Sequence, residues 1–231
     1  MSALAAPLFN VDAGELDDEP AELWSLAHVL HVACGGHAGD ATSMRRALTR
    51  AVAAGARVGA HPSYPDREGF GRRTVTLAPR ALTESLRAQC ASLRKLADDA
   101  GVALTSLKPH GALYHDAARS PALARDLAEL TRELLGSGAS LVGPPGPPGA
   151  LRDAARDAGL SYLREGFADR GYAADGALLP RSAEGALITD PETAVAQARA
   201  LWASGAVDTL CVHGDNPAAL PLLRALRAAF A

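Results

Sequence analysis

The chain has 231 residues and a formal charge of −3 at pH 7, with 48% apolar and 21% charged residues. This balance is ordinary for a globular protein with a sizeable core, and it offers no basic surface for a nucleic acid or for an anionic membrane. The opening MSALAAPLFN has no basic start and no long apolar run, so we expect neither a signal peptide nor a membrane segment. Three widely spaced cysteines without a CxxC pair indicate reduced thiols and a cytoplasmic protein.

Short apolar stretches alternate with amphipathic stretches along the whole sequence. In chain order, the expected strands are residues 6–11, 29–34, 57–60, 103–107, 140–142, 161–164 and 208–212. The expected helices are 42–54, 79–99, 121–135, 149–158, 191–203 and 217–230. Asp40 or Thr42 is expected to cap the first of them, and Ser120 followed by Pro121 is typical of a helix start.

Strands that alternate with helices predict a parallel sheet covered by helices. We therefore expect one α/β domain over residues 1–231, a (β/α) barrel of about seven parallel strands. An open doubly wound sheet is the alternative. The phosphate-binding patterns GxGxxG after the first strand and GxxxxGK[ST], which would favour it, are missing from the sequence.

Polar residues gather at the expected carboxyl ends of the strands. Four of the seven histidines directly follow an apolar run, and two carboxylates end the first one: Asp12, Glu15, His37, His61, His110 and His213. In a parallel barrel these ends meet on the face that carries the active site. We therefore predict one shared polar site, and we expect His28, His31 and His115 to be surface or packing residues.

The same residues suggest a metal site. Asp12 with His61 and His110 would suit a divalent ion such as zinc, manganese or iron. The helical spacings HExxH and HxxxH are absent, so the ligands would come from separate strands.

Two long connections, 61–73 and 166–191, are expected to reach the same face. A long connection without periodicity usually carries function, and the first one contains Arg72. Asp169 and Arg170 lie at the start of the second, where an arginine can hold a carboxylate through two parallel hydrogen bonds.

Lys108 is one of only two lysines, and it precedes Pro109 and His110 at a strand end. It would supply a positive charge to an anionic substrate or, with a lowered pKa, act as a base.

Six segments resemble the LamB/YcsF family, which includes the first of the subunits (A, B and C) of bacterial ATP-dependent 5-oxoprolinase. In the family's order they are NVDAGE (10–15), ACGGHAGD (33–40), GAHPSYPDREGFGRR (59–73), KPHGALYH (108–115), FADRGYAADGALLPRSAEGALITDPE (167–192) and CVHGDNPAA (211–219). The resemblance implies a barrel similar to the glycoside hydrolase/deacetylase fold. Val11 and Ala13 stand where the family's first motif usually has Cys and Met, and His31 and Gly36 stand where its second motif has Asn and Phe. We expect these differences to remove side chains from one wall of the pocket.

The resemblance also implies an activity. The family's enzyme opens the lactam ring of 5-oxo-L-proline to L-glutamate, with ATP as co-substrate and with partner subunits B and C. On this interpretation Asp12, His61 and His110 position or deprotonate the attacking water, while Lys108 holds the substrate or its developing charge. The residues expected to bind substrate or ATP, or to orient the others, are Glu15, His37, Asp40, Arg72, Asp169, Arg170 and His213.

Two other functions remain open from the sequence. One is a metal-dependent deacetylase or amidohydrolase that acts alone, for example on a carbohydrate. The other is a non-catalytic subunit that binds a small ligand or holds its partners together.

Overall fold

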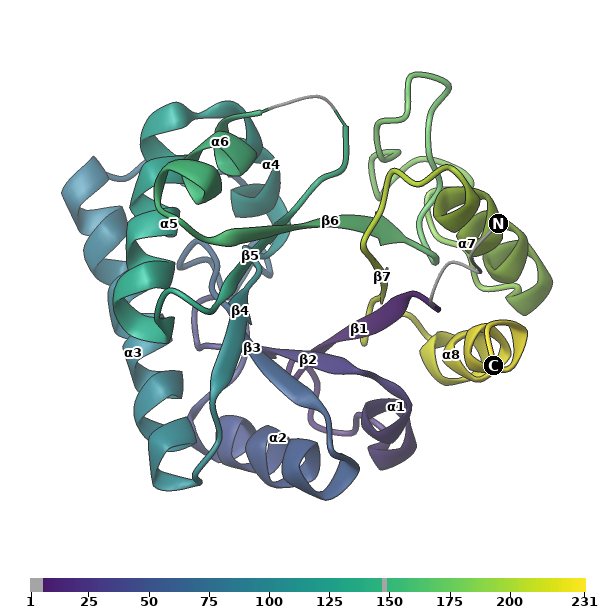
Figure 1. The fold of residues 1–231 in the computed structure, drawn as a ribbon, viewed down its shortest axis with the longest axis horizontal. Helices are drawn as coiled ribbons and strands as arrows, with labels where there is room; N and C mark the ends of the chain where they lie inside the picture. The colour runs from purple at the N-terminus through teal and green to yellow at the C-terminus, as the bar shows by residue number, and fades with distance from the viewer. Residues whose placement is uncertain (1–5, 147–148) are drawn as a thin grey trace.

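The computed structural model describes residues 6–146 and 149–231, and over these ranges seven parallel strands close into a barrel (Figure 1). In sequence order, the strands are β1 (Leu8–Ala13), β2 (Val29–Ala33), β3 (Arg57–His61), β4 (Leu104–Leu107), β5 (Ser140–Gly143), β6 (Ser161–Phe167) and β7 (Thr209–Val212). Strand β7 pairs with β1, for example Val11 beside Val212, so the sheet closes on itself. The predicted (β/α) barrel is confirmed, and the open doubly wound alternative is wrong.

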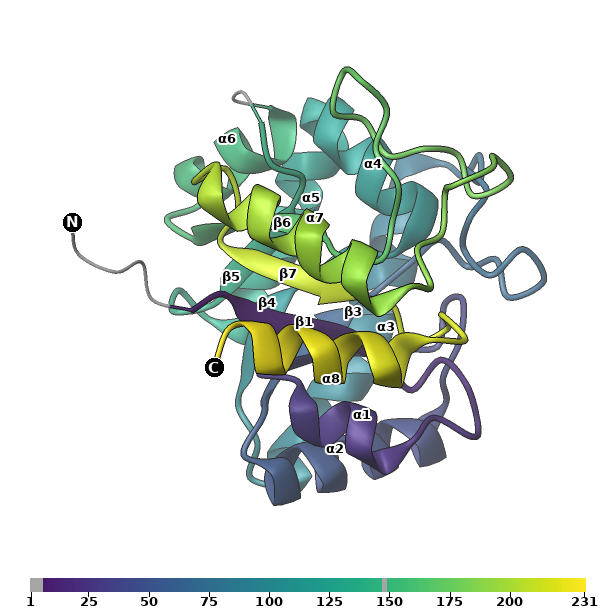
Figure 2. The same cartoon turned by 90° about the vertical axis from the view of Figure 1, so that its right-hand side faces the viewer.

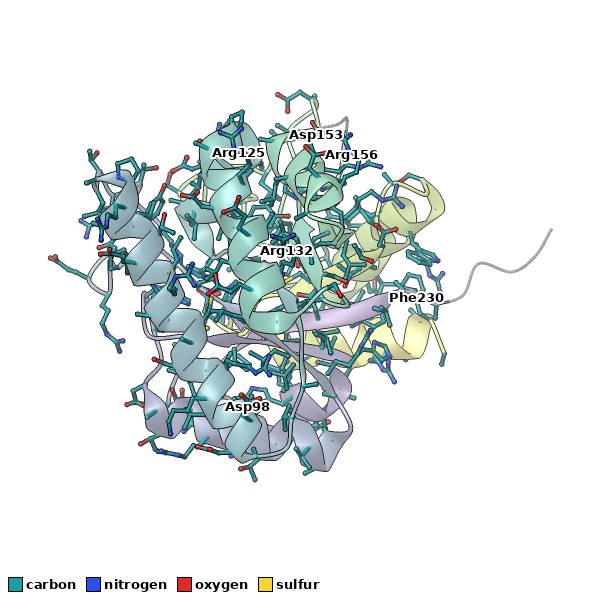
Figure 3. All side chains as sticks on the ribbon, turned by 60° about the vertical axis from the view of Figure 1, so that its left-hand side comes forward. Asp98, Arg125, Arg132, Asp153, Arg156 and Phe230 are labelled. Atoms are coloured by element: carbon teal, nitrogen blue, oxygen red, sulfur yellow. The ribbon has the colours of Figure 1, made fainter. Side chains whose placement is uncertain are left out.

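Helices surround this barrel on the outside (Figure 1). They are α1 (Ala21–Leu26), α2 (Ala41–Ala54), α3 (Pro79–Asp99), α4 (Gly111–Arg119), α5 (Pro121–Leu135), α6 (Ala150–Asp157), α7 (Pro191–Ala203) and α8 (Ala219–Ala229). Their outer faces are polar: Figure 3 shows Asp98, Arg125, Arg132 and Arg156, all exposed, on α3, α5 and α6. Their inner faces pack aliphatic side chains against the strands in one large apolar cluster.

The local signals in the sequence explain most helix ends. Asp40 caps α2 by accepting hydrogen bonds from the backbone N–H groups of Thr42 and Ser43, and Gly55 ends that helix with a φ of 66°. Ser120 and Pro121 begin α5 as expected, and Asp190 caps α7 in the same way. Helices α3, α5 and α7 have the bounds that the sequence predicts.

Two helices and two strands differ most from the sequence prediction. Helices α1 and α4 were not expected, since they have only six and nine residues and little periodicity. Strand β1 is shifted toward Ala13, and β6 continues past Arg164 to Phe167. These shifts bring Asp12 and Glu165 into the strands themselves.

The long connections lie together at one end of the barrel. Figure 2 shows that the long connections after β3 and β6 extend from the same end of the barrel.

No helix in the described part of the chain is long and apolar enough to cross a membrane. Cys34, Cys90 and Cys211 are free and buried, in agreement with the prediction of reduced thiols.

Candidate active site

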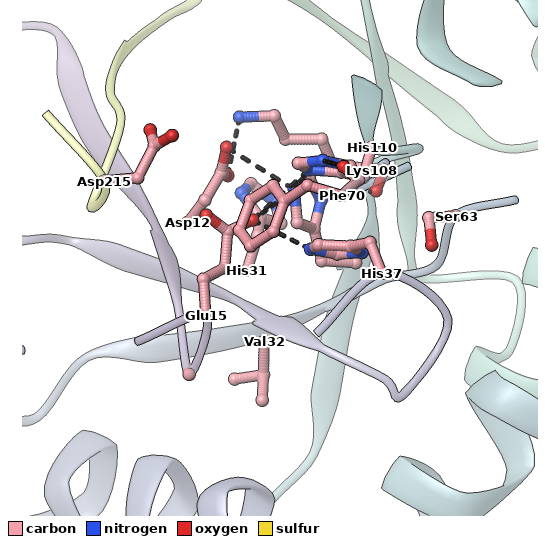
Figure 4. Close-up of polar contacts among 12 residues, drawn as sticks. Asp12, Glu15, His31, Val32, His37, Ser63, Phe70, Lys108, His110 and Asp215 are labelled. Atoms are coloured by element: carbon pink, nitrogen blue, oxygen red, sulfur yellow. Dashed lines mark hydrogen bonds and ion pairs between the residues drawn. The ribbon is translucent and has the colours of Figure 1, made fainter. Parts of the chain in front are cut away.

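The strand-end residues predicted to share a site do converge at one end of the barrel, where Figure 4 shows Asp12, Glu15, His37 and His110 close together. Asp12 lies in β1, His61 ends β3, and His213 directly follows β7. The chain after β4 continues beside β3, because Lys108 N–H donates to the Ala60 carbonyl at 2.9 Å and His110 N–H to the Pro62 carbonyl at 2.8 Å. This continued pairing holds the Lys108 and His110 side chains at the mouth of the barrel.

Lys108 is buried between two carboxylates, with only 2% of its surface exposed. Its Nζ lies 2.8 Å from Asp12 Oδ1, 2.9 Å from Glu165 Oε1 and 3.1 Å from Cys211 Sγ. Burial alone would lower the pKa of Lys108, but Asp12, Cys211 and Glu165 together raise it well above its ordinary value. Lys108 is therefore a permanent cation, and the alternative of a lysine base with a lowered pKa does not fit.

Glu165 is a site residue that the sequence patterns did not reveal. It is completely buried, and burial raises its pKa even though Lys108 opposes this effect. The expected strand stopped one residue earlier, so Glu165 was placed in a loop. The alternation of β6 was the available signal, since Glu165 and Phe167 both reach Lys108 inside the barrel.

A second cluster joins three histidines to Glu15. Glu15 Oε1 lies 2.9 Å from His37 Nε2, 3.2 Å from His110 Nδ1 and 3.7 Å from His61 Nε2. Burial would raise the pKa of Glu15, but its contacts with His110 and His37 hold it well below its ordinary value. Burial lowers the pKa of His37 to about 4 and also lowers that of His110. Glu15 is thus ionised beside neutral His37 and His110 rings at neutral pH.

Asp12 lies between the two clusters. Its Oδ2 lies 3.4 Å from His61 Nε2, while its Oδ1 accepts from Lys108. Burial would raise the pKa of Asp12, but His61 and Lys108 bring it well below the ordinary value. The arrangement therefore presents an ionised carboxylate to the cavity.

His213 and Asp169 form a separate buried pair. His213 Nδ1 donates to Asp169 Oδ1 at 2.9 Å, and Asp169 Oδ2 accepts from the His213 backbone N–H at 3.0 Å. Burial would lower the pKa of His213, but Asp169 raises it above the ordinary value. Because Nδ1 is occupied, Nε2 is the nitrogen of His213 that can exchange a proton with a bound molecule.

A cavity of about 650 Å³ opens over these groups and is lined by Asp12, His61, Lys108, His110 and His213. Four arginines also line it: Arg72, Arg119, Arg170 and Arg181. Arg72 and Arg181 both pair with Asp215. Arg170 is fixed by hydrogen bonds from Nε to the Ala186 carbonyl and from Nη2 to the Leu179 carbonyl. A small anionic molecule fits such a cavity in size and charge.

Some of the predicted residues lie elsewhere. Asp40 is exposed, and its carboxylate caps α2 outside the cavity lining, so its role here is structural. Asp169, Glu15 and His37 do not line the cavity themselves; Asp169 contacts His213, and Glu15 contacts His37.

None of the four departures from the family pattern lines the cavity, which corrects the expectation from the sequence; His31 and Gly36 show why. His31 points into the barrel interior, where it contacts Asn10 and Ser106. A side chain at Gly36 would collide with Gln89 and Ser63 instead. Neither position lines the cavity.

Comparisons with known proteins agree with this architecture. The sequence model of the LamB/YcsF family matches residues 10–231. A protein from Symbiobacterium thermophilum, named as the A subunit of 5-oxoprolinase, is 44% identical over an alignment 254 positions long, which covers 98% of this chain and 94% of that protein. The crystal structure of a lactam utilization protein from Thermus thermophilus superposes with a TM-score of 0.86 at 35% identity, covering 98% of this chain and 96% of that one. A xylose isomerase domain protein from Planctomyces limnophilus, at 15% identity and a TM-score of 0.55 over 99% of each chain, shares the fold alone.

Proposed function

This chain belongs to the LamB/YcsF family, and we propose from that premise that it is the A subunit of an ATP-dependent 5-oxoprolinase. The reaction would open the lactam of 5-oxo-L-proline to L-glutamate with hydrolysis of ATP. The observation that carries the proposal is the 44% identity, over 98% of the chain, to the Symbiobacterium thermophilum protein of that name. The name of the Thermus thermophilus structure, a lactam utilization protein, points to the same class of substrate.

Opening the lactam requires activation of its carbonyl carbon and protonation of its ring nitrogen. A lactam carbonyl is a poor electrophile, and its oxygen becomes negative when water attacks the carbon. Transfer of the γ-phosphoryl group of ATP to that oxygen would make the carbon attackable and provide a phosphate leaving group. Water would then attack that carbon, and the C–N bond would break as the ring nitrogen gains a proton, which leaves an acyl phosphate. A second water would hydrolyse the acyl phosphate to the new carboxylate and inorganic phosphate.

The cations around the cavity suit the negative parts of this reaction. Lys108 would place a fixed positive charge near the carbonyl oxygen, where charge develops in the transition state. Arg170, held rigidly by its two carbonyl contacts, is suited to the substrate carboxylate or to a phosphate.

The polar side chains at the cavity would position the water and transfer the protons. Asp12, His61 and His110 lie together there, and we assign the positioning of the attacking water to the two histidines and its deprotonation to Asp12. His213, held by Asp169, would give the proton from Nε2 to the departing ring nitrogen.

The nucleotide and the partners complete the proposal. The cavity would take part of the ATP at Arg72 and Arg181, which line it beside Asp215. Because the relative is named as one subunit, we propose that subunits B and C join this chain in the active enzyme.

The test is 5-oxoproline-dependent ATP hydrolysis with release of glutamate. The chain is assayed alone and together with candidate B and C subunits, with substrate omitted as the control. We expect coupled hydrolysis and glutamate release only in the complete mixture. Mixtures that assemble but release no glutamate would reject the proposal.

The histidine and glutamate cluster favours a second candidate, a metal-dependent amidohydrolase that acts alone. It predicts hydrolysis of an amide by the isolated chain when a divalent metal is added without ATP. Release of glutamate that depends strictly on ATP would exclude it.

A further inference from the structure

One ring nitrogen of His61 faces one ring nitrogen of His110, and neither has a hydrogen to donate to the other. His61 Nδ1 lies 2.8 Å from the Lys108 carbonyl, and His110 Nε2 lies 3.0 Å from the Phe70 carbonyl. A carbonyl oxygen only accepts hydrogen bonds, so these two nitrogens carry the hydrogens. When both rings are neutral, the other nitrogens, His61 Nε2 and His110 Nδ1, therefore carry a lone pair and no hydrogen. They lie 2.9 Å apart.

The surrounding atoms add more acceptors. Glu15 Oε1 lies 3.2 Å from His110 Nδ1 and 3.7 Å from His61 Nε2, and Asp12 Oδ2 lies 3.4 Å from His61 Nε2. Buried acceptors that point at one another without a hydrogen between them repel, and a cation placed among them would remove the repulsion.

The spacing of these atoms fits a metal ion. For ligand bonds of 2.0–2.1 Å, two ligands of a tetrahedral zinc lie about 3.3 Å apart. The three separations among Glu15 Oε1, His61 Nε2 and His110 Nδ1 are 2.9, 3.2 and 3.7 Å, on both sides of that value. The planes of the two rings are 89° apart, so both lone pairs can point at one central ion.

His37 belongs to the cluster but is not suited to be a ligand. Its ring is stacked on His110 with the planes 2° apart and the centroids 3.6 Å apart. An ion in the plane of the His110 ring therefore lies outside the plane of the His37 ring. His37 Nε2 instead lies 2.9 Å from Glu15 Oε1, where its hydrogen can orient the carboxylate.

The hydrogen bonds that His61 and His110 donate to backbone carbonyls are of the kind found at metal-binding histidines. Histidine ligands usually donate their other ring N–H to a carbonyl or carboxylate, which fixes the tautomer and the ring orientation. The Phe70 carbonyl that serves His110 comes from a residue with a φ of 53°, the one non-glycine residue with positive φ in the described ranges. The fold thus accepts backbone strain where His110 is oriented.

We propose that Glu15, His61 and His110 bind one divalent transition-metal ion of the zinc class. Two imidazoles and one carboxylate are ligands that suit zinc, cobalt or iron better than magnesium. The set replaces Asp12 of the sequence prediction with Glu15, because Asp12 Oδ1 is held by Lys108. His61 and His110 both line the cavity, so the fourth position of the ion would face a bound molecule.

The test measures metal binding to the full chain with no substrate and no partner, so its result does not depend on the proposed function. Protein stripped with a chelator is titrated with Zn²⁺ and, in parallel, with Co²⁺, whose visible absorption reports low-coordinate nitrogen and oxygen ligands. Equilibrium dialysis with elemental analysis gives the stoichiometry. We expect one ion per chain and a rise in melting temperature with Zn²⁺.

Variants identify the ligands. We expect His61→Ala, His110→Ala and Glu15→Gln each to weaken Zn²⁺ binding by more than about 100-fold, and His37→Ala by about 10- to 100-fold. The matched control is His28→Ala. His28 is half-buried, contacts Phe9 N–H and Arg227, and lies outside the cavity lining. This variant should bind Zn²⁺ like wild type.

Two results would overturn the proposal. One is wild-type protein that retains no Zn²⁺ or Co²⁺, which would leave a shared proton between the two rings as the explanation. The other is equal binding by wild type and His110→Ala. If an alanine variant fails to fold by circular dichroism, Glu15→Gln, which keeps the shape of the side chain, decides the question.

Discussion

Two polar layers lie inside the same barrel, and they differ in how their hydrogen bonds are arranged. The first layer contains Asn10, His31, Ser106 and Thr209, and the second contains the site residues around Lys108 and His110. Both layers are buried. The first forms an ordered chain of hydrogen-bond donors and acceptors. In the second, acceptors face acceptors and two carboxylates share one cation.

In the first layer each hydrogen bond can pair one donor with one acceptor. The Ser106 hydroxyl can donate to His31 Nε2 at 3.1 Å, and His31 Nδ1 can donate to Asn10 Oδ1 at 3.3 Å. Asn10 Nδ2 then donates to Thr209 Oγ1 at 2.9 Å, which donates to the Leu8 carbonyl at 2.8 Å. Burial lowers the pKa of His31 well below its ordinary value, so the layer is neutral.

In the second layer two carboxylates share one lysine, and two bare ring nitrogens oppose each other. Proteins usually satisfy buried polar groups, and exceptions gather where a ligand or a reaction completes them. The first layer therefore stabilises the barrel, while the second leaves polar groups that a bound ion or substrate would complete. The following changes test that difference.

Lys108→Met should have the largest effect. Methionine has a similar volume but leaves Asp12 and Glu165 buried without their cation, which costs about 3–5 kcal/mol. We expect turnover of the assembled enzyme to fall by about 1,000-fold, since the charge near the carbonyl oxygen is lost. Urea unfolding and the coupled assay measure the two effects. The matched control is Lys95→Met, at the exposed lysine on α3, and wild-type turnover in Lys108→Met would contradict the account.

Gly111→Ala should disturb the site through the backbone. Gly111 has a φ of 55°, and a Cβ there would collide with the Gly71 carbonyl oxygen, beside His110. We expect a loss of about 2–3 kcal/mol in the free energy of unfolding and a clear fall in turnover. Gly101→Ala is the control, because Gly101 has a φ of 66° but open space around it. Its cost should be about 1 kcal/mol, without an effect on turnover. Equal effects of the two variants would show that the contact with Gly71 is unimportant.

Thr209→Val should affect stability alone. It keeps the shape of the side chain but removes the hydroxyl that joins Asn10 to the Leu8 carbonyl. We expect a loss of about 1–2 kcal/mol in the free energy of unfolding and turnover within about twofold of wild type. A tenfold fall in turnover would mean that the first layer also takes part in the reaction.

The pair of His213 and Asp169 should give the smallest effect, a change with pH. The pKa of His213 is raised in the folded state, so its contribution to stability is complete below the unfolded pKa of about 6.5 and is lost as pH rises through the folded value. The pKa of Asp169 is lowered, so its contribution is lost only in acid. We expect the stability difference between wild type and His213→Gln to be larger at about pH 5.5 than at about pH 8.5. A difference that grows with pH would contradict this assignment.

Much of the fold could be predicted from the sequence because the patterns are local. All seven strands were expected within a few residues, and the order of strands and helices led to a parallel barrel. The same reasoning placed His61, His110 and His213 at one end, because parallel strands share a direction. The short helices α1 and α4 were missed, since neither has enough turns to show a period.

The details of the site depend on contacts that no local pattern contains. Glu165 was missed because the predicted strand ended at Arg164, and its contact with Lys108 joins residues far apart in the sequence. Asp40 was expected both to cap a helix and to belong to the site, and the structure shows the cap, with Asp40 outside the cavity lining. The opposed nitrogens of His61 and His110 follow from the Lys108 and Phe70 carbonyls, which only the folded chain brings to them.

The central claim is that the strand-end cluster carries out the opening of the lactam. The most direct test is the turnover of the assembled enzyme with His110→Ala, compared with the His28→Ala control. We predict a fall of more than about 100-fold for His110→Ala, with assembly retained and the control unchanged. A fall of less than about tenfold in a folded, assembled His110→Ala enzyme would contradict the account.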